Sequence, residues 1–166
     1  MKINTRPANL PARVFVLVAF AFIMGSAANT LRTDDRGIPW RNTWSNHVET
    51  RAQREGLELV NTEQAHRIVE EGTHVVFDAR SGTAYLEGYI PGSISLPYAD
   101  IDTAFLEAQI FITPQQPILT YCSDHTCDDA LLLSLFLLDH GYTNIVLYAG
   151  GMKEWTEAGH PIEGAQ

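Results

Sequence analysis

The chain has few basic side chains, and this shortage excludes one class of partner. Only two of its 166 residues are lysines, there is no basic run beyond the N-terminus, and the formal net charge is −9. Nucleic-acid binding needs clustered Lys and Arg, so we expect no nucleic-acid partner. The sequence also contains no internal repeat and no low-complexity tract. Its apolar content of 45% and its length indicate one globular domain with a core and some additional chain.

The additional chain includes an apolar segment near the N-terminus. Lys2, Arg6 and Arg13 precede an uncharged run over residues 14–28. This is the pattern of an export signal with a positive first part and an apolar second part, and small residues at 26–28 offer a cleavage site. Alternatively, residues 1–31 are a retained anchor that contacts the membrane through residues 14–31. A helix of that length falls just short of a hydrocarbon core of ~30 Å. A buried core helix is a third reading, but the positive flank disfavours it.

Both leading readings predict the same compartment for the rest of the chain. The positive flank stays in the cytoplasm and the remainder crosses the membrane. We therefore expect the domain on the periplasmic or other extracytoplasmic side, anchored to the inner membrane or secreted after cleavage. Such compartments are oxidising, which matters for cysteine chemistry.

The remaining chain divides into a linker with a helical arm at residues 32–56 and a regular α/β domain at residues 57–163. In this domain short apolar strands alternate with helices, which predicts βαβ units and a mostly parallel sheet with helices on both faces. Trp155 is expected in the core, and the five histidines outside the cysteine loop have no partner by spacing. The predicted strands are 57–60, 75–77, 93–96, 117–121 and 144–148, and the predicted helices are 61–71, 82–87, 101–109, 130–138 and 152–157.

Cys122 is the first candidate for a functional side chain. It follows the predicted strand at 117–121 and lies on a short loop before the predicted helix at 130–138. Loops at the carboxyl ends of strands carry the sites of α/β proteins. A helix N-terminus lowers the pKa of a thiol, and the thiolate is the nucleophile. The alternative is an inert buried cysteine, which is the commoner fate of free cysteines.

Four short motifs occur in an order that resembles the rhodanese family. They are Asp-Ala-Arg at 78–80, Gly-Tyr-Ile-Pro-Gly at 88–92, Cys122 after a strand, and Gly-Gly-x-x-x-Trp at 150–155. Tyr89 replaces the histidine that is usual in the second motif. The resemblance covers residues 57–163 and implies a five-stranded parallel sheet with helices on both sides.

The resemblance also implies a sulfurtransferase that needs no cofactor. Cys122 would attack a small sulfane sulfur donor, become a persulfide, and pass the sulfur to a thiol or other thiophilic acceptor. Backbone N–H groups of the loop and the following helix N-terminus would stabilise the thiolate and the persulfide. Asp78 and Arg80 would support the fold around the loop. The substrate-binding loop would comprise Ser123, Asp124, His125, Thr126, Cys127 and Asp128.

The loop departs from the family pattern in its charge. It has no Arg or Lys beside Cys122, and it carries Asp124, Asp128 and Asp129. These carboxylates oppose a dianionic donor such as thiosulfate and tend to raise the pKa of Cys122. Asp128 and Asp129 are also favourable for a simpler reason, because acids stabilise a helix N-terminus. A persulfide or polysulfide donor is therefore at least as plausible as thiosulfate.

Cys127 offers further alternatives. It could be a redox partner that forms a disulfide with Cys122 or accepts its sulfur, or it could merely fill space. We predict a reversible Cys122–Cys127 disulfide that blocks sulfur transfer until a thiol opens it. A metal site of Cys122, His125 and Cys127 is disfavoured by the close spacing of its ligands.

Two other functional classes bear on the same loop. The rival function is a non-catalytic domain that uses Cys122 and Cys127 to bind or deliver sulfur or a metal. A phosphatase is excluded, since its phosphate-binding arginine would occupy position 128, which is Asp128.

Overall fold

The computed structural model describes residues 10–30 and 47–164, with side chains from residue 13 to 27 in the first of these segments. The chain divides into two compact units, residues 1–42 and 43–166. The first unit contains the helix α1 (Leu10–Thr30). Within the described segments, no helix has both the length and the apolar content needed to cross a membrane. The export signal and the anchor remain predictions, and residues 32–46 of the predicted linker and arm lie outside the described residues.

The second unit is built on a five-stranded, wholly parallel sheet with the strand order β1-β5-β4-β2-β3. β4 lies at the centre, where Tyr121 pairs with Asp78 of β2 and with Tyr148 of β5. The carboxyl ends of the three central strands are therefore level, and the loops that follow them meet at one edge. The strands are β1 (Glu58–Leu59), β2 (Val75–Asp78), β3 (Ile94–Ser95), β4 (Ile118–Tyr121) and β5 (Ile145–Tyr148).

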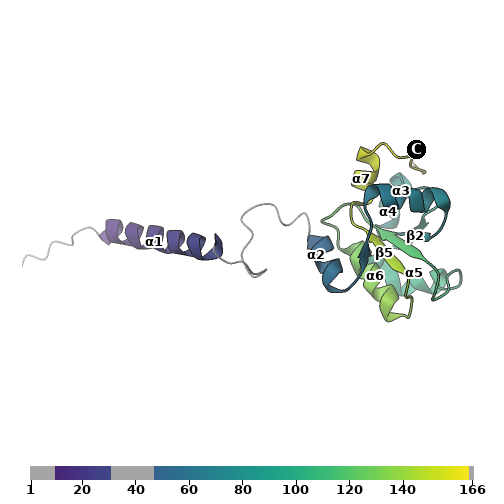
Figure 1. Cartoon of the computed structure of the whole chain (residues 1–166), viewed down its shortest axis with the longest axis horizontal. Coiled ribbons are helices and arrows are strands. Elements are labelled where there is room, and N and C mark those ends of the chain that lie inside the picture. Colours follow the sequence, from purple (N-terminus) through teal and green to yellow (C-terminus); the bar gives the residue numbers. More distant parts are fainter. Residues whose placement is uncertain (1–9, 31–46, 165–166) are drawn as a thin grey trace, which may run out of the picture. The chain divides into compact units, whose positions relative to one another are not determined.

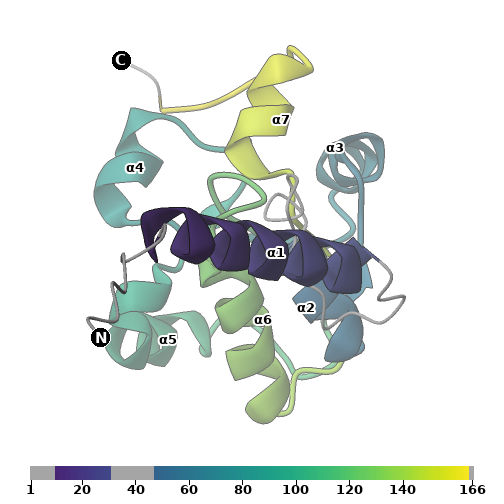
Figure 2. The same ribbon diagram turned by 90° about the vertical axis from the view of Figure 1, so that its left-hand side faces the viewer.

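Helices cover both faces of the sheet, as the sequence predicts (Figures 1 and 2). One face packs against α2, α5 and α6, and the other packs against α3 and α7. Successive residues of β4 alternate between the two cores, with Ile118 on the first and Leu119 on the second. The helices are α2 (His47–Arg54), α3 (Thr62–Glu71), α4 (Gly82–Glu87), α5 (Ile101–Ala108), preceded by the 3-10 turn η2 (Tyr98–Asp100), α6 (Asp129–Asp139) and α7 (Gly151–Glu157).

Local sequence signals account for several helix ends. Asn61 and Gln64 form a reciprocal capping box at the start of α3, with both hydrogen bonds at 2.9 Å. Gly72 ends the same helix in the left-handed conformation, with φ 61°. Ser81 caps α4 by accepting a hydrogen bond from the Ala84 N–H. The helices predicted at residues 61–71 and 82–87 are confirmed, and these caps explain where they begin and where the first one ends.

The arm helix α2 is part of the domain core. Its residues Val48 and Ala52 are 1% and 0% exposed and pack in the core that includes α5 and α6. Their four-residue spacing places both on one helix face. The sequence predicted a helical arm within residues 32–56, and the structure shows that one face of this helix is buried. α2 also contacts the loop that follows β4, because its Glu49 lies 3.1 Å from His125.

Candidate active site at the Cys122 loop

The structure places Cys122 immediately after β4, at the carboxyl edge of the sheet. The strand before it is fully buried, and Cys122 itself is 3% exposed. The loop ends where α6 begins at Asp129, so the predicted order of strand, cysteine loop and helix is confirmed. Cys127 is half-buried on the same loop, while Ser123 and Thr126 are exposed.

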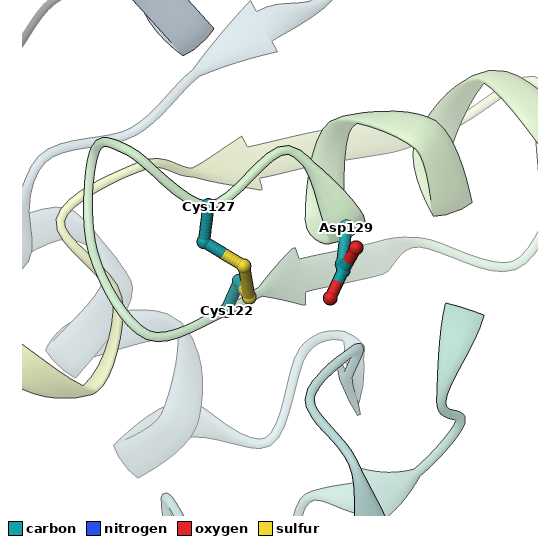
Figure 3. A group of neighbouring side chains, drawn as sticks. All are labelled: Cys122, Cys127 and Asp129. Atoms are coloured by element: carbon teal, nitrogen blue, oxygen red, sulfur yellow. A yellow bond between two sulfur atoms is a disulfide. The ribbon is translucent and has the colours of Figure 1, made fainter. Parts of the chain in front are cut away.

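Cys122 and Cys127 form a disulfide (Figure 3), with their Cα atoms 6.1 Å apart. This separation lies within the range that a disulfide needs. The predicted bond is therefore present, while its reversibility stays a prediction. In this state the Cys122 sulfur is bonded to a second sulfur and is not a nucleophile.

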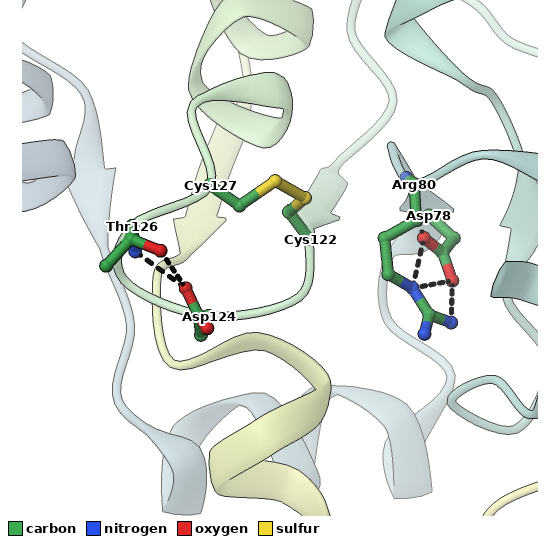
Figure 4. Close-up of a disulfide and its surroundings, with 6 residues drawn as sticks. All are labelled: Asp78, Arg80, Cys122, Asp124, Thr126 and Cys127. Atoms are coloured by element: carbon green, nitrogen blue, oxygen red, sulfur yellow. Dashed lines mark hydrogen bonds and ion pairs between the residues drawn. A yellow bond between two sulfur atoms is a disulfide. The ribbon is translucent and has the colours of Figure 1, made fainter.

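Hydrogen bonds within the loop hold it curled independently of the disulfide (Figure 4). The Asp124 carboxylate accepts bonds from the Thr126 N–H at 2.8 Å and from the Thr126 hydroxyl at 2.6 Å. The Cys127 N–H donates to the Asp124 carbonyl oxygen at 3.1 Å. The two bonds from Thr126 lower the pKa of Asp124. The N–H groups of Thr126 and Cys127 were expected to point at the Cys122 sulfur. In the oxidised loop both donate to oxygens of Asp124 instead.

The Gly-Gly motif allows α7 to dock against the backbone of the cysteine loop. The Met152 N–H donates to the Cys122 carbonyl at 3.0 Å, and the Lys153 N–H donates to the Ser123 carbonyl at 2.9 Å. Gly151 has φ +59°, and a Cβ atom there would lie 2.8 Å from the Ser123 carbonyl carbon. Only glycine fits this approach, which gives the motif a physical reason.

His125 links the loop to two helices. Its Nε2 lies 2.7 Å from Glu154 of α7, and its Nδ1 lies 3.1 Å from Glu49 of α2. The bond to His125, followed by one from Thr62, lowers the pKa of Glu154 despite its partial burial. Because both ring nitrogens face carboxylates, the metal hypothesis that included His125 loses this ligand.

Asp128 makes a second connection to α2. His47 Nε2 lies 3.1 Å from its carboxylate, and Arg51 lies 3.8 Å away. No partner of His47 was predictable from spacing, and neither Glu49 nor Arg51 was predicted as a site residue. Each pairs with a residue more than seventy positions along the chain, so no spacing rule points to the contact. The sequence did offer one signal, because Glu49 and Arg51 flank the apolar positions of α2 and so lie beside the face that packs on the domain.

Asp129, the first residue of α6, faces the disulfide (Figure 3). One of its carboxylate oxygens and the sulfurs of Cys122 and Cys127 all lie within 4.8 Å of one another. Burial, and then the neighbouring charge of Asp128, raise the pKa of Asp129. These three residues differ from the predicted metal ligands, because Asp129 stands in place of His125. Two sulfurs that are bonded to each other do not coordinate a metal as thiolates. The arrangement instead places a proton-accepting group beside the sulfurs.

The Asp-Ala-Arg motif joins the strand end to the Gly-Tyr-Ile-Pro-Gly turn (Figure 4). The Arg80 Nε lies 3.0 Å from both carboxylate oxygens of Asp78, which is 0% exposed. Arg80 also donates to the Gly88 carbonyl at 2.7 Å.

Tyr121 anchors the same turn from β4. Its hydroxyl accepts from the Ile90 N–H at 3.1 Å and contacts the Ser93 hydroxyl at 3.0 Å, and burial raises its pKa. From sequence, Tyr121 was predicted only as a strand residue. A buried tyrosine hydroxyl needs a hydrogen-bond partner, so its position one residue before Cys122 could have indicated a polar contact beside the site.

Comparison with known proteins gives a consistent set of similarities. The uncharacterized protein BU052 of Buchnera aphidicola subsp. Acyrthosiphon pisum (strain APS) is 25% identical over 104 residues, which are 63% of this chain and 70% of that protein. The BH2092 protein of Bacillus halodurans is 21% identical with a TM-score of 0.60, covering 72% of this chain and 86% of that one.

Two further solved structures share the fold. A thiosulfate sulfurtransferase from Pseudomonas aeruginosa is 22% identical with a TM-score of 0.60, covering 74% of this chain but 23% of that one. The rhodanese-like domain of the Anabaena Alr3790 protein is 23% identical with a TM-score of 0.53, covering 64% and 78%. At these identities the structures show the fold alone.

The family comparison covers more than half of the chain. The model of the rhodanese-like domain matches residues 61–158, which include all four motifs. At the level of the family, this match supports a function of the sulfurtransferase type. The chain belongs to the rhodanese-like domain family.

Proposed function

We propose that the protein is a sulfurtransferase that carries a sulfane sulfur as a persulfide on Cys122. The sulfur would come from a small donor and pass to a thiol or another thiophilic acceptor. The observation that carries this proposal is the position of Cys122 between the end of β4 and the N-terminus of α6. The positive end of a helix stabilises a thiolate there without a basic side chain.

In the proposed cycle, the Cys122–Cys127 disulfide is a closed state that a thiol must open before sulfur is accepted. The compartment supports this part of the proposal, because a thiol pair in an oxidising environment tends to close. The charge pattern of residues 1–31 favours that environment. We therefore place the domain on the periplasmic or other extracytoplasmic side, anchored or secreted.

Intact-mass measurement of Cys127→Ser tests the proposed function. This variant has one thiol, so no internal disulfide competes with loading. After incubation with inorganic polysulfide it should gain the mass of one sulfur atom and lose it again to an added thiol. The double variant Cys122→Ser with Cys127→Ser contains no thiol and no disulfide, and as the control it should gain nothing. A variant that stays at its starting mass with polysulfide and with thiosulfate would rule out the persulfide.

The acidic loop keeps a second function open, namely a non-catalytic domain that uses Cys122 and Cys127 to hold sulfur, a metal or reducing equivalents for a partner. The number of donor equivalents consumed per chain separates the two functions. An enzyme turns over many equivalents of donor in the presence of a thiol acceptor, whereas a carrier stops after one sulfur per chain.

Asp124→Asn is expected to improve the use of thiosulfate about fivefold. Its lowered pKa keeps the Asp124 carboxylate ionised at neutral pH, where it opposes a dianion. Removing this repulsion at a partly exposed site is worth about 1 kcal/mol, or fivefold in kcat/KM. Asparagine retains an oxygen that accepts from Thr126, so the loop should keep its shape.

The kcat/KM for thiosulfate, compared with that for an uncharged organic trisulfide, checks this prediction. The value for the uncharged donor should stay within twofold. A high thiosulfate rate in the wild type that Asp124→Asn leaves unchanged would show that the loop charge does not select the donor.

A further inference from the structure

We propose that Cys127 is a resolving thiol that discharges the Cys122 persulfide inside the loop and releases its outer sulfur as hydrogen sulfide. This inference rests on the proposed function, because it needs a persulfide on Cys122. It adds a second activity to the same site, the reduction of sulfane sulfur. It also assigns a class of partner, a dithiol reductant that returns the protein to its starting state.

The geometry supplies the required contact. The Cys127 sulfur is bonded to the Cys122 sulfur in the structure, so it reaches the atom that a resolving thiol must attack. The contacts that bring it there do not depend on the disulfide. They are the Asp124–Thr126 bonds, the Cys127 N–H bond to the Asp124 carbonyl, and the anchoring of His125 to α2 and α7. The two sulfurs therefore stay neighbours after reduction.

The reaction balances without an external oxidant. The Cys127 thiolate attacks Sγ of the persulfidated Cys122, and a bond forms between the two cysteine sulfurs. The persulfide reacts in its protonated form, the bond from Cys122 Sγ to the outer sulfur breaks, and the outer sulfur leaves with the electron pair and its own hydrogen as hydrosulfide. The outer sulfur is thereby reduced by two electrons, and the two cysteine sulfurs are oxidised to the disulfide seen in the structure.

Asp129 is placed to move the proton in this step. Its carboxylate oxygen lies within 4.8 Å of both cysteine sulfurs, at the start of α6, a separation across which one bridging water relays a proton. As a base it takes the proton from Cys127, and as an acid it returns that proton to the leaving hydrosulfide. Burial and then the charge of Asp128 raise the pKa of Asp129. The raised pKa is closer to that of a thiol, which favours proton transfer between the two groups.

The loop favours this internal route over transfer to an outside acceptor. A thiol held on the same loop acts at an effective concentration above that of a free thiol in solution. Asp124 also repels anionic acceptors, whereas it does not affect the approach of Cys127, which is already in place. Transfer to an external thiol then requires that acceptor to compete with Cys127.

The exposure of the two cysteines indicates how a reductant resets the site. Cys122 is 3% exposed, whereas Cys127 is half-buried. An incoming thiolate therefore attacks the Cys127 sulfur, and Cys122 leaves as a thiolate beside the helix N-terminus. A second thiol of the same reductant then frees Cys127 and completes a two-electron exchange.

One equivalent of inorganic polysulfide, added without oxygen to reduced protein freed of reductant, tests this inference. Intact mass after acid quenching is read together with released sulfide. Wild-type protein should end two hydrogen atoms lighter than its reduced form, with no added sulfur. Cys127→Ser should end one sulfur atom heavier. Wild type should also release one more sulfide per chain than the variant, and dithiothreitol should restore its reduced mass.

The outcomes separate the two proposals. Wild-type protein that keeps the added sulfur beside a free Cys127 overturns the resolving role and leaves the proposed function intact. If neither Cys127→Ser nor Cys127→Ala takes up sulfur, the proposed function fails and this inference fails with it. Sulfide release from Cys127→Ala equal to that from wild type also overturns the resolving role.

Asp129→Asn tests the proton step. Closure of the disulfide after loading should slow by about a hundredfold, within the usual range for a general acid–base group. In wild type the closure rate should fall as pH drops through the raised pKa of Asp129, because only the ionised carboxylate is a base. Asp129→Asn should lose that part of the pH profile. An unchanged profile removes Asp129 from the step.

Discussion

Cys122→Ser is expected to reduce sulfur transfer to background, a loss of at least about a thousandfold. A hydroxyl at this position is far less nucleophilic than a thiolate near neutral pH and does not hold sulfur. The variant should show no gain in mass with any donor, while Cys127→Ser gains one sulfur. Steady-state transfer to an added thiol and intact mass together measure the effect.

The fold should survive this substitution, since serine differs from cysteine by one atom. Urea unfolding of both serine variants and wild type under reducing conditions provides the control, because none of the three then contains the disulfide. Similar midpoints would assign the loss to chemistry. Mass gain by Cys122→Ser, with none by Cys127→Ser, would reverse the roles of the two cysteines.

Arg80→Met is expected to lower the free energy of unfolding by about 3–5 kcal/mol. The substitution leaves the Asp78 carboxylate, which is 0% exposed, without its cation. It also removes the donor to the Gly88 carbonyl and so releases the turn that Tyr121 anchors. Urea unfolding monitored by far-ultraviolet circular dichroism measures the change.

A double-mutant cycle separates the lost charge partner from the lost packing. Asp78→Asn combined with Arg80→Met should be more stable than Arg80→Met alone, because no unpaired charge is then buried. Arg54→Met is the matched control on the exposed side of α2, with an expected change within about 0.5 kcal/mol. If Arg80→Met lowered the free energy of unfolding no more than Arg54→Met does, the Asp78–Arg80 ion pair would not be important for stability.

The fold was predictable from sequence because its signals are local. Apolar runs of strand length, the Asn61–Gln64 capping box and Gly72 each act within a few residues. Together they specify where elements begin and end, and the regular alternation of strands and helices specifies a parallel sheet. Cys122 was predictable for the same reason, since a strand end and a helix start bracket it directly.

The connections around the loop were not predictable, because they join distant segments. Glu49 and Glu154 lie on either side of His125 in sequence, and only the packing of α2 and α7 brings them to it. Asp129 illustrates a second limit. Its sequence position indicated a helix N-terminus, while its proximity to the two sulfurs depends on how the loop curls.

The family model matches residues 61–158, but the segment that packs as one core is longer, because α2 is buried in that core. A fragment cut at residues 61–158 would lack β1, an edge strand, and the buried side chains of Val48 and Ala52. It would also leave His125 and Asp128 without the partners that α2 supplies. The N-terminal boundary of the family match therefore differs from that of the segment that packs as one core, and residues outside the match hold the reactive loop.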